Sequence, residues 1–234
     1  MEFSVQTANP AKAETACLVL PVYKGSDLLP AVAKLDDASE QLIGQLLERG
    51  DFDAVLGNTQ LVPFAPGLGA DRILLVGLGE RDKCQEAAFI KALDAAMTAL
   101  TKLPIDEACA TFTDVPLADR DAAWKARKTL EAVERAIYRF DQFKSSPAKA
   151  PSLAKLTLIV SDADDAPLAK QGAALGTAIG QGINFTRTLG NLPGNVCTPR
   201  YLAEQAEALG RDSQGALAVD ILDEEAASSQ HDSS

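Results

Sequence analysis

Histidine is almost absent from this sequence of 234 residues. The single histidine, His231, lies in the polar segment 223–234, which has no apolar face and which we expect to be a disordered tail. A Ser-His-Asp or Cys-His mechanism needs a base held in a defined position. The HExxH pattern of many zinc peptidases is absent as well. The sequence therefore offers no histidine that could support nucleophilic or zinc chemistry.

Long apolar runs and positive charge are also scarce. No apolar stretch approaches the roughly 20 residues that span a bilayer, and residues 1–5 lack the basic start of a secretory signal. We therefore expect a cytoplasmic protein that does not enter a membrane. The net charge of −11 makes nucleic acid and anionic membranes unfavoured partners. The basic cluster Lys125, Arg127 and Lys128 is interpreted as the solvated face of a helix.

The cysteines do not form a recognisable set. Cys17, Cys84, Cys109 and Cys197 lie far apart, and none belongs to a CxxC pair. This spacing argues against a disulfide framework and against a zinc ribbon. Cys17 and Cys109 lie within apolar runs, where a buried and inert thiol is expected.

Short apolar runs that alternate with helical patterns are what the sequence does contain. Non-alternating runs such as 73–78 and 156–160 are typical of strands buried on both faces. Apolar residues three and four apart predict helices around residues 42–47, 89–100 and 130–140. The pattern predicts an α/β fold with a layered mixed sheet flanked by helices. The predicted strands are 3–6, 17–22, 73–78, 108–112 and 156–160, with 60–64 as an edge strand because Pro63 cannot donate to a ladder.

The C-terminal third of the chain contains longer helical patterns. A helix predicted from about residue 166 to 189 carries Gly172, Gly176 and Gly180, whose spacing places them near one face. Another backbone can approach closely at such a face. Thr198 and Pro199 predict the start of a helix that runs to about residue 209. Residues 216–222 are predicted to form a final strand.

Glycines and carboxylates that resemble ligand sites have simpler interpretations. The third glycine of a dinucleotide fingerprint is missing after Gly77 and Gly79, which favours a turn at the end of a strand. Gly67 and Gly69 are likewise interpreted as part of a turn. Carboxylates that are close in sequence can hold a hard cation, but in an acidic protein we interpret them as solvated. They are Asp162, Asp164 and Asp165, together with the pairs Asp36-Asp37 and Glu224-Glu225. From the residues alone, we assign no catalytic, cofactor-binding or metal site.

Three segments resemble the N-terminal part of the leucyl aminopeptidase family. Residues 71–79 (DRILLVGLG) resemble the central strand of its N-terminal domain, and residues 138–144 (YRFDQFK) resemble the end of a long helix there. Residues 188–203 (TLGNLPGNVCTPRYLA) are similar to the family segment DLGNLPPNICTPxYLA, with Thr188 and Gly194 as the departures. Residues 219–223 (VDILD) resemble an early strand of the catalytic domain. The resemblance covers roughly residues 1–222.

The resemblance implies a division of the chain into four parts. These are an α/β domain similar to macro domains at 1–162, a linker helix at 163–190, the start of a truncated catalytic domain at 191–222, and the tail. Full-length members of the family are homo-oligomers that remove residues such as leucine from peptides, with two divalent metals, manganese or zinc. The metal-binding stretch NTDAEGR has no counterpart here. The resemblance therefore implies an inactive regulatory or assembly domain. A stand-alone module that binds a nucleotide-derived ligand is the alternative.

Overall fold

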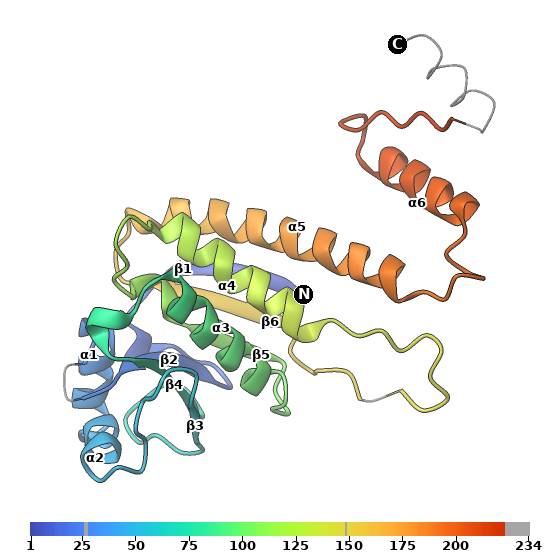
Figure 1. The fold of residues 1–234 in the computed structure, drawn as a ribbon. Helices are drawn as coiled ribbons and strands as arrows, with labels where there is room; N and C mark the ends of the chain where they lie inside the picture. Colours follow the sequence, from blue (N-terminus) through green and yellow to red (C-terminus); the bar gives the residue numbers. More distant parts are fainter. Residues whose placement is uncertain (26–27, 148, 223–234) are drawn as a thin grey trace. The chain divides into compact units, whose positions relative to one another are not determined.

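Six strands form one mixed sheet in the order β1-β6-β5-β2-β4-β3 (Figure 1). The computed structural model describes residues 1–25, 28–147 and 149–222, and it contains two units, 1–184 and 185 onward. All neighbouring strands run parallel except β3 and β4. The predicted α/β class with a layered mixed sheet is confirmed. The strands are β1 (Glu2–Thr7), β2 (Leu18–Tyr23), β3 (Thr59–Val62), β4 (Ile73–Gly79), β5 (Glu107–Ala110) and β6 (Lys155–Val160).

Two prolines, Pro63 and Pro21, lie where the hydrogen-bond pattern of the sheet can accommodate a missing N–H. β3 lies at the sheet edge, as predicted, and ends directly before Pro63. Pro21 lies inside β2, a strand with neighbours on both sides, but β5 pairs only with Leu18 and Val19. The missing N–H of Pro21 therefore falls where the β5 ladder has already ended. β5 itself is shorter than the predicted strand 108–112, because Phe112–Asp114 forms a 3-10 turn.

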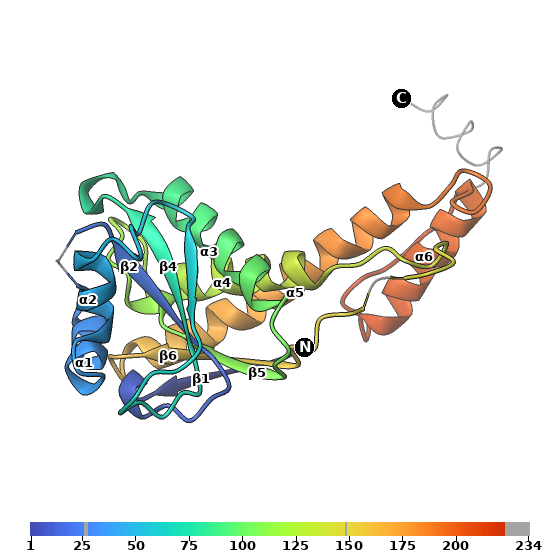
Figure 2. The same ribbon diagram turned by 90° about the horizontal axis from the view of Figure 1, so that it is seen from below.

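Helices cover both faces of the sheet in the first unit (Figure 2). α1 and α2 lie on one face, while α3, α4 and the first part of α5 lie on the other. This arrangement explains why β2 is buried along its whole length and β4 at all but its last residue. The helices are α1 (Pro30–Ala38), α2 (Leu42–Glu48), α3 (Glu86–Leu100), α4 (Ala122–Ile137), α5 (Asp165–Asn191) and α6 (Pro199–Asp212).

Local signals determine where the helices begin. The side chain of Asp121 accepts a hydrogen bond of 2.8 Å from the Trp124 amide and caps α4. In the second unit, Thr198 caps α6 in the same way by accepting from Tyr201 at 3.3 Å, and Pro199 follows at the first helical position. The predicted start of this helix is confirmed.

An aromatic cluster fills the core between the sheet and the helices. Phe89 of α3 meets Phe112 edge-on, with ring centroids 5.8 Å apart, and the Trp124 ring lies at the same distance. Phe89 and Phe112 are completely buried. Burying such a ring contributes about 1.5–3 kcal/mol. The cluster therefore joins α3, α4 and the end of β5 into one core.

The second unit corrects one prediction. Residues 216–222 were expected to form a strand, but no strand is present in the described residues from 185 to 222. Ser213, directly after α6, instead accepts a hydrogen bond of 2.9 Å from the Leu217 amide. A strand requires a paired neighbour, and within this part of the chain the structure supplies none. The predicted tail, 223–234, lies outside the described residues.

Candidate functional site

Three glycines form the contact between α4 and the first part of α5. A Cβ atom on Gly172 would lie 2.0 Å from the Ala123 carbonyl oxygen, and one on Gly176 would lie 2.3 Å from that of Arg127. A Cβ on Gly180 would lie 2.5 Å from Cβ of Glu134. These spaces hold no side chain, so only glycine lets the two helices approach this closely. The predicted glycine face is confirmed, and we call this contact the α4–α5 seam.

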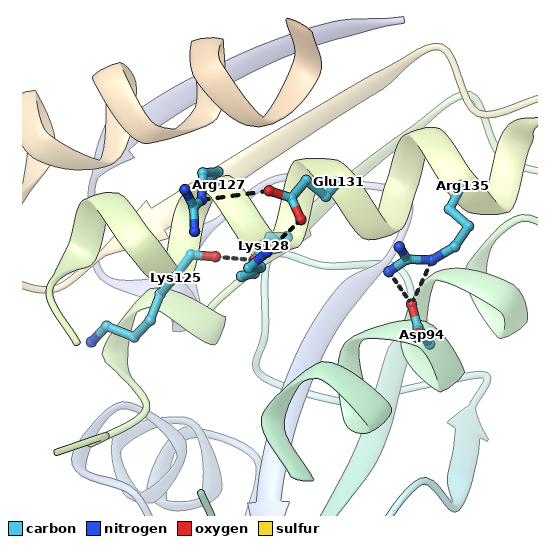
Figure 3. A network of polar contacts seen from close by, with 7 residues as sticks. Asp94, Lys125, Arg127, Lys128, Glu131 and Arg135 are labelled. Carbon is cyan, nitrogen blue, oxygen red and sulfur yellow. Dashed lines mark hydrogen bonds and ion pairs between the residues drawn. The ribbon is translucent and has the colours of Figure 1, made fainter. Parts of the chain in front are cut away.

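Charged side chains of α4 lie beside the seam (Figure 3). Glu131 is only 8% exposed. Its carboxylate forms ion pairs with Lys128 Nζ at 2.7 Å and with Arg127 Nε at 3.4 Å. The Arg127 contact is an ion pair without hydrogen-bond geometry at Nε. Further along α4, Arg135 contacts Asp94 of α3 at 2.7 Å. Arg127, Lys128 and Glu131 therefore form a local ion-pair cluster, and Arg135 links α4 to α3.

Lys125 departs most from the sequence interpretation. Its side chain is buried, and Nζ donates to the Val115 carbonyl at 3.2 Å. Burial lowers the pKa of this ammonium group, and the carboxylates of Asp165, Asp114 and Asp121 oppose that shift. The interpretation of Lys125, Arg127 and Lys128 as a solvated face is therefore wrong for Lys125. The connection from β5 to α4 folds over this side chain, and the helical period alone cannot show that.

Glu134 is the second buried charge on α4. The residue is 5% exposed, and its Oε1 has no hydrogen-bond partner among the described residues. Burial raises the pKa of this carboxyl group, while the terminal ammonium of Met1 lowers it. The backbone carbonyl of Glu134 accepts a hydrogen bond of 2.8 Å from Asn184 Nδ2 of α5. Nothing in the sequence period distinguishes this glutamate from a solvated one.

Two acids near the end of β6, Asp114 and Asp162, act in local structure. Asp114 accepts from the amide and the hydroxyl of Ser161 at 3.1 and 2.7 Å, and Asp162 accepts from the Asp164 amide at 3.0 Å. Among the described residues, no group of three His, Cys, Asp or Glu side chains could hold a metal ion. The part of the chain that the structure describes therefore does not fit a two-metal centre. His231 and the pair Glu224-Glu225 lie outside it.

The glycines at the end of β4 make room for a neighbouring segment of the chain. A Cβ on Gly77 would lie 2.1 Å from the Val55 carbonyl oxygen, and Gly79 has a positive φ of 74°. Gly77 also exchanges backbone hydrogen bonds with Gly57 and Asn58 at 2.9 and 2.8 Å. Residues 54–58 therefore pack directly against the end of β4. β4 ends at Gly79, so the interpretation of these glycines as the end of a strand is confirmed.

The cysteines are all free thiols. Cys17 and Cys109 are buried, as predicted, and burial raises the pKa of Cys17 to about 12. Burial also raises the pKa values of Cys84 and Cys109. A thiol with a raised pKa is a poor nucleophile at neutral pH. Separately, among the described residues, no helix is both long and apolar enough to cross a membrane.

Comparison with known proteins gives a consistent family assignment. The model of the cytosol aminopeptidase family, N-terminal domain, matches residues 19–147. A probable cytosol aminopeptidase of Chromohalobacter salexigens is 68% identical over 97% of this chain and 45% of its own length. The cytosol aminopeptidase of Pseudomonas aeruginosa is 39% identical over 96% of this chain, again 45% of its own length. The chain thus spans about 45% of the length of these relatives.

Solved structures agree on the fold. A mutant of tomato leucine aminopeptidase superposes with a TM-score of 0.79 at 20% identity, covering 99% of this chain and 46% of that one. The bottromycin maturation enzyme BotP in complex with Mn gives a TM-score of 0.64 at 21% identity, with 86% and 37% covered. At these identities the likeness concerns the fold alone.

Proposed function

Because the chain belongs to the cytosol aminopeptidase family, we propose that it is the regulatory and assembly domain of a di-metal aminopeptidase. The complete enzyme would remove N-terminal residues such as leucine from peptides in the cytoplasm. The observation that carries the proposal is the match of residues 19–147 to the N-terminal domain of this family. The relatives contain further sequence beyond the matched 45% of their length, and catalysis would belong to that part.

The proposal assigns the two divalent metals, manganese or zinc, to that further part. Its support is chemical, since Asp114 and Asp162 are used as local hydrogen-bond acceptors and the described residues hold no metal-binding group. When bound, such a pair of metals supplies an activated water and polarises the scissile carbonyl. No residue described in this chain is given a catalytic role.

An assembly role is supported by the construction of α5. The helix begins in the first unit, and its last residues, from Phe185 on, belong to the second. Within the first unit, the α4–α5 seam leaves no space for a side chain. The first part of α5 is therefore fixed against α4 within the first unit. The homo-oligomeric state of the complete enzyme remains part of the proposal.

Activity of the 234-residue chain is the direct test. We expect no release of p-nitroaniline from leucine p-nitroanilide, with or without added Mn²⁺ or Zn²⁺. The Pseudomonas aeruginosa relative, assayed in parallel, serves as the positive control. Metal-dependent release that a chelator abolishes would contradict the proposal.

A chimera tests the assembly role positively. The chain would be joined to the remaining part of the Chromohalobacter salexigens relative, to which it is 68% identical. We expect the chimera to hydrolyse the substrate and to form an oligomer on size-exclusion chromatography with light scattering. The remaining part alone should lose the assembly. If that part alone assembles and acts like the chimera, this domain has no assembly function.

A further inference from the structure

A cavity of about 570 Å³ lies between α1, α2 and the segment 50–53. Its apolar wall includes Leu28, Leu47 and Phe52, and Phe52 is 4% exposed. Gly44 of α2 also lines the cavity. A space of this size is within the range of small-molecule sites, which are mostly apolar with a few placed polar groups. The cavity therefore has room for a small ligand with an apolar body.

The charged groups around this cavity are almost all negative. Asp36, Asp37, Glu48 and Asp53 line it, and Lys24 is the one cation among its described lining residues. Asp36 is 8% exposed, and its Oδ1 accepts from the amides of Ile43 and Gly44 at 2.7 and 3.1 Å. Its Oδ2 lies 3.0 Å from the position that a Cβ on Gly44 would take. A carboxylate that is more than nine-tenths buried is thus held in place at the wall of the cavity.

We propose that this cavity binds a small organic cation, namely a primary ammonium group attached to an aliphatic body. The aliphatic part would displace water from Leu28, Leu47 and Phe52, while the ammonium group would face the carboxylates. An anionic ligand of the same shape would meet a surplus of negative charge. For the same reason, a phosphate-bearing nucleotide is not a suitable ligand here. Binding at this cavity is independent of peptidase activity.

Titration with n-hexylammonium tests the proposal on the 234-residue chain. Amide chemical shifts should move saturably for residues of α1, α2 and 50–53, and the affinity should fall as the ionic strength rises. Hexanoate has an equally long aliphatic chain but carries the opposite charge, so it should cause no saturable shift there. Equal binding of hexanoate, or no saturable binding of hexylammonium, would overturn the proposal.

Two variants separate the charge from the apolar wall. The double substitution Asp37→Asn with Glu48→Gln removes two exposed lining carboxylates and should weaken hexylammonium binding by about fivefold. Glu14→Gln removes an exposed carboxylate that does not line the cavity and should leave the affinity unchanged. Leu47→Trp should reduce binding of hexylammonium by filling space. Equal weakening by Glu14→Gln, or full affinity in both cavity variants, would show that the cation binds elsewhere.

Discussion

At the scale of single residues, Glu134 holds a buried carboxyl oxygen without a hydrogen-bond partner in the described structure. Burial is the main cause of its raised pKa, and the ammonium group of Met1 only opposes it. The folded state therefore binds this proton more tightly than the unfolded state does. The neutral form is tolerated at low pH, and the cost of the buried charge develops as the pH rises from the unfolded pKa through the folded one.

Replacing Glu134 by methionine should make the first unit more stable at neutral pH. A buried charged group without partners costs at least 1–3 kcal/mol, so we expect a gain on the order of 1 kcal/mol. The gain should shrink toward zero as the pH falls below the unfolded pKa of the carboxyl group. Urea denaturation, followed by the fluorescence of Trp124, measures this difference over a pH series. A constant difference across the series would show that ionisation of Glu134 is not its cause.

The buried charges of α4 also show where sequence reasoning stops at the residue scale. Lys125 and Glu134 lie in a helix rich in charged residues, and a period of 3.6 cannot tell which of those residues a third element will cover. The glycine spacing in α5 was the available signal, because three small residues on one face require a close partner. It predicted a close contact without identifying α4 as the partner.

At the scale of elements, the effect of a Gly→Ala substitution in α5 on stability should depend on whether the glycine lies in the α4–α5 seam. In Gly176→Ala, the added methyl group would lie 2.3 Å from the Arg127 carbonyl oxygen, so one helix must shift. Forcing extra atoms into a tight contact costs about 1–3 kcal/mol. Gly182→Ala is the matched control, because a Cβ there meets nothing within 4 Å. That variant should gain up to about 1 kcal/mol through helix propensity.

Urea denaturation of both variants, with the unsubstituted protein as reference, measures the difference in stability. We expect Gly176→Ala to shift the midpoint to lower urea and Gly182→Ala to leave it unchanged or raise it. The two substitutions are chemically identical and lie in the same helix. Opposite changes in the urea midpoint would therefore show that the α4–α5 seam causes the loss of stability in Gly176→Ala. If both variants lose stability equally, the close approach of α4 and α5 is not the cause.

Elements that carry their own boundary signals were predictable, and elements defined by partners were not. Thr198 and Pro199 mark the start of α6 locally, and the structure confirms it. Residues 216–222 have the apolar content of a strand but no paired neighbour, so that prediction is wrong. α1 was not predicted. Its 9 residues include the buried Asp36, so the buried face of this helix is not purely apolar. The carboxylate of Asp36 accepts a hydrogen bond from the Ile43 amide of α2.

At the scale of the whole molecule, the boundary of the first unit depends on the start of α5. The first unit extends to Asn184, and the domain end near residue 162 that the resemblance implies stays a prediction. Ala169 and Ala173 of α5 are completely buried and belong to the core. The close contacts of Gly172 and Gly176 with α4 lie in the same stretch. Sequence could not show this, because a helix between two domains can pack on either of them.

Two shortened chains test this boundary. A chain ending after Asn184 should keep the midpoint of the complete chain when thermal unfolding is followed by Trp124, because it retains the whole first unit. A chain ending after Asp162 loses the α5 side of the seam, where Gly172, Gly176 and Gly180 lie against α4. We expect its midpoint to fall by roughly 4–8 °C, since a loss of about 2 kcal/mol has this effect in a domain of this size. Circular dichroism would check that α4 remains helical in the shorter chain. Equal midpoints for the two shortened chains would mean that α5 adds nothing to the first unit, and the domain would then end near residue 162.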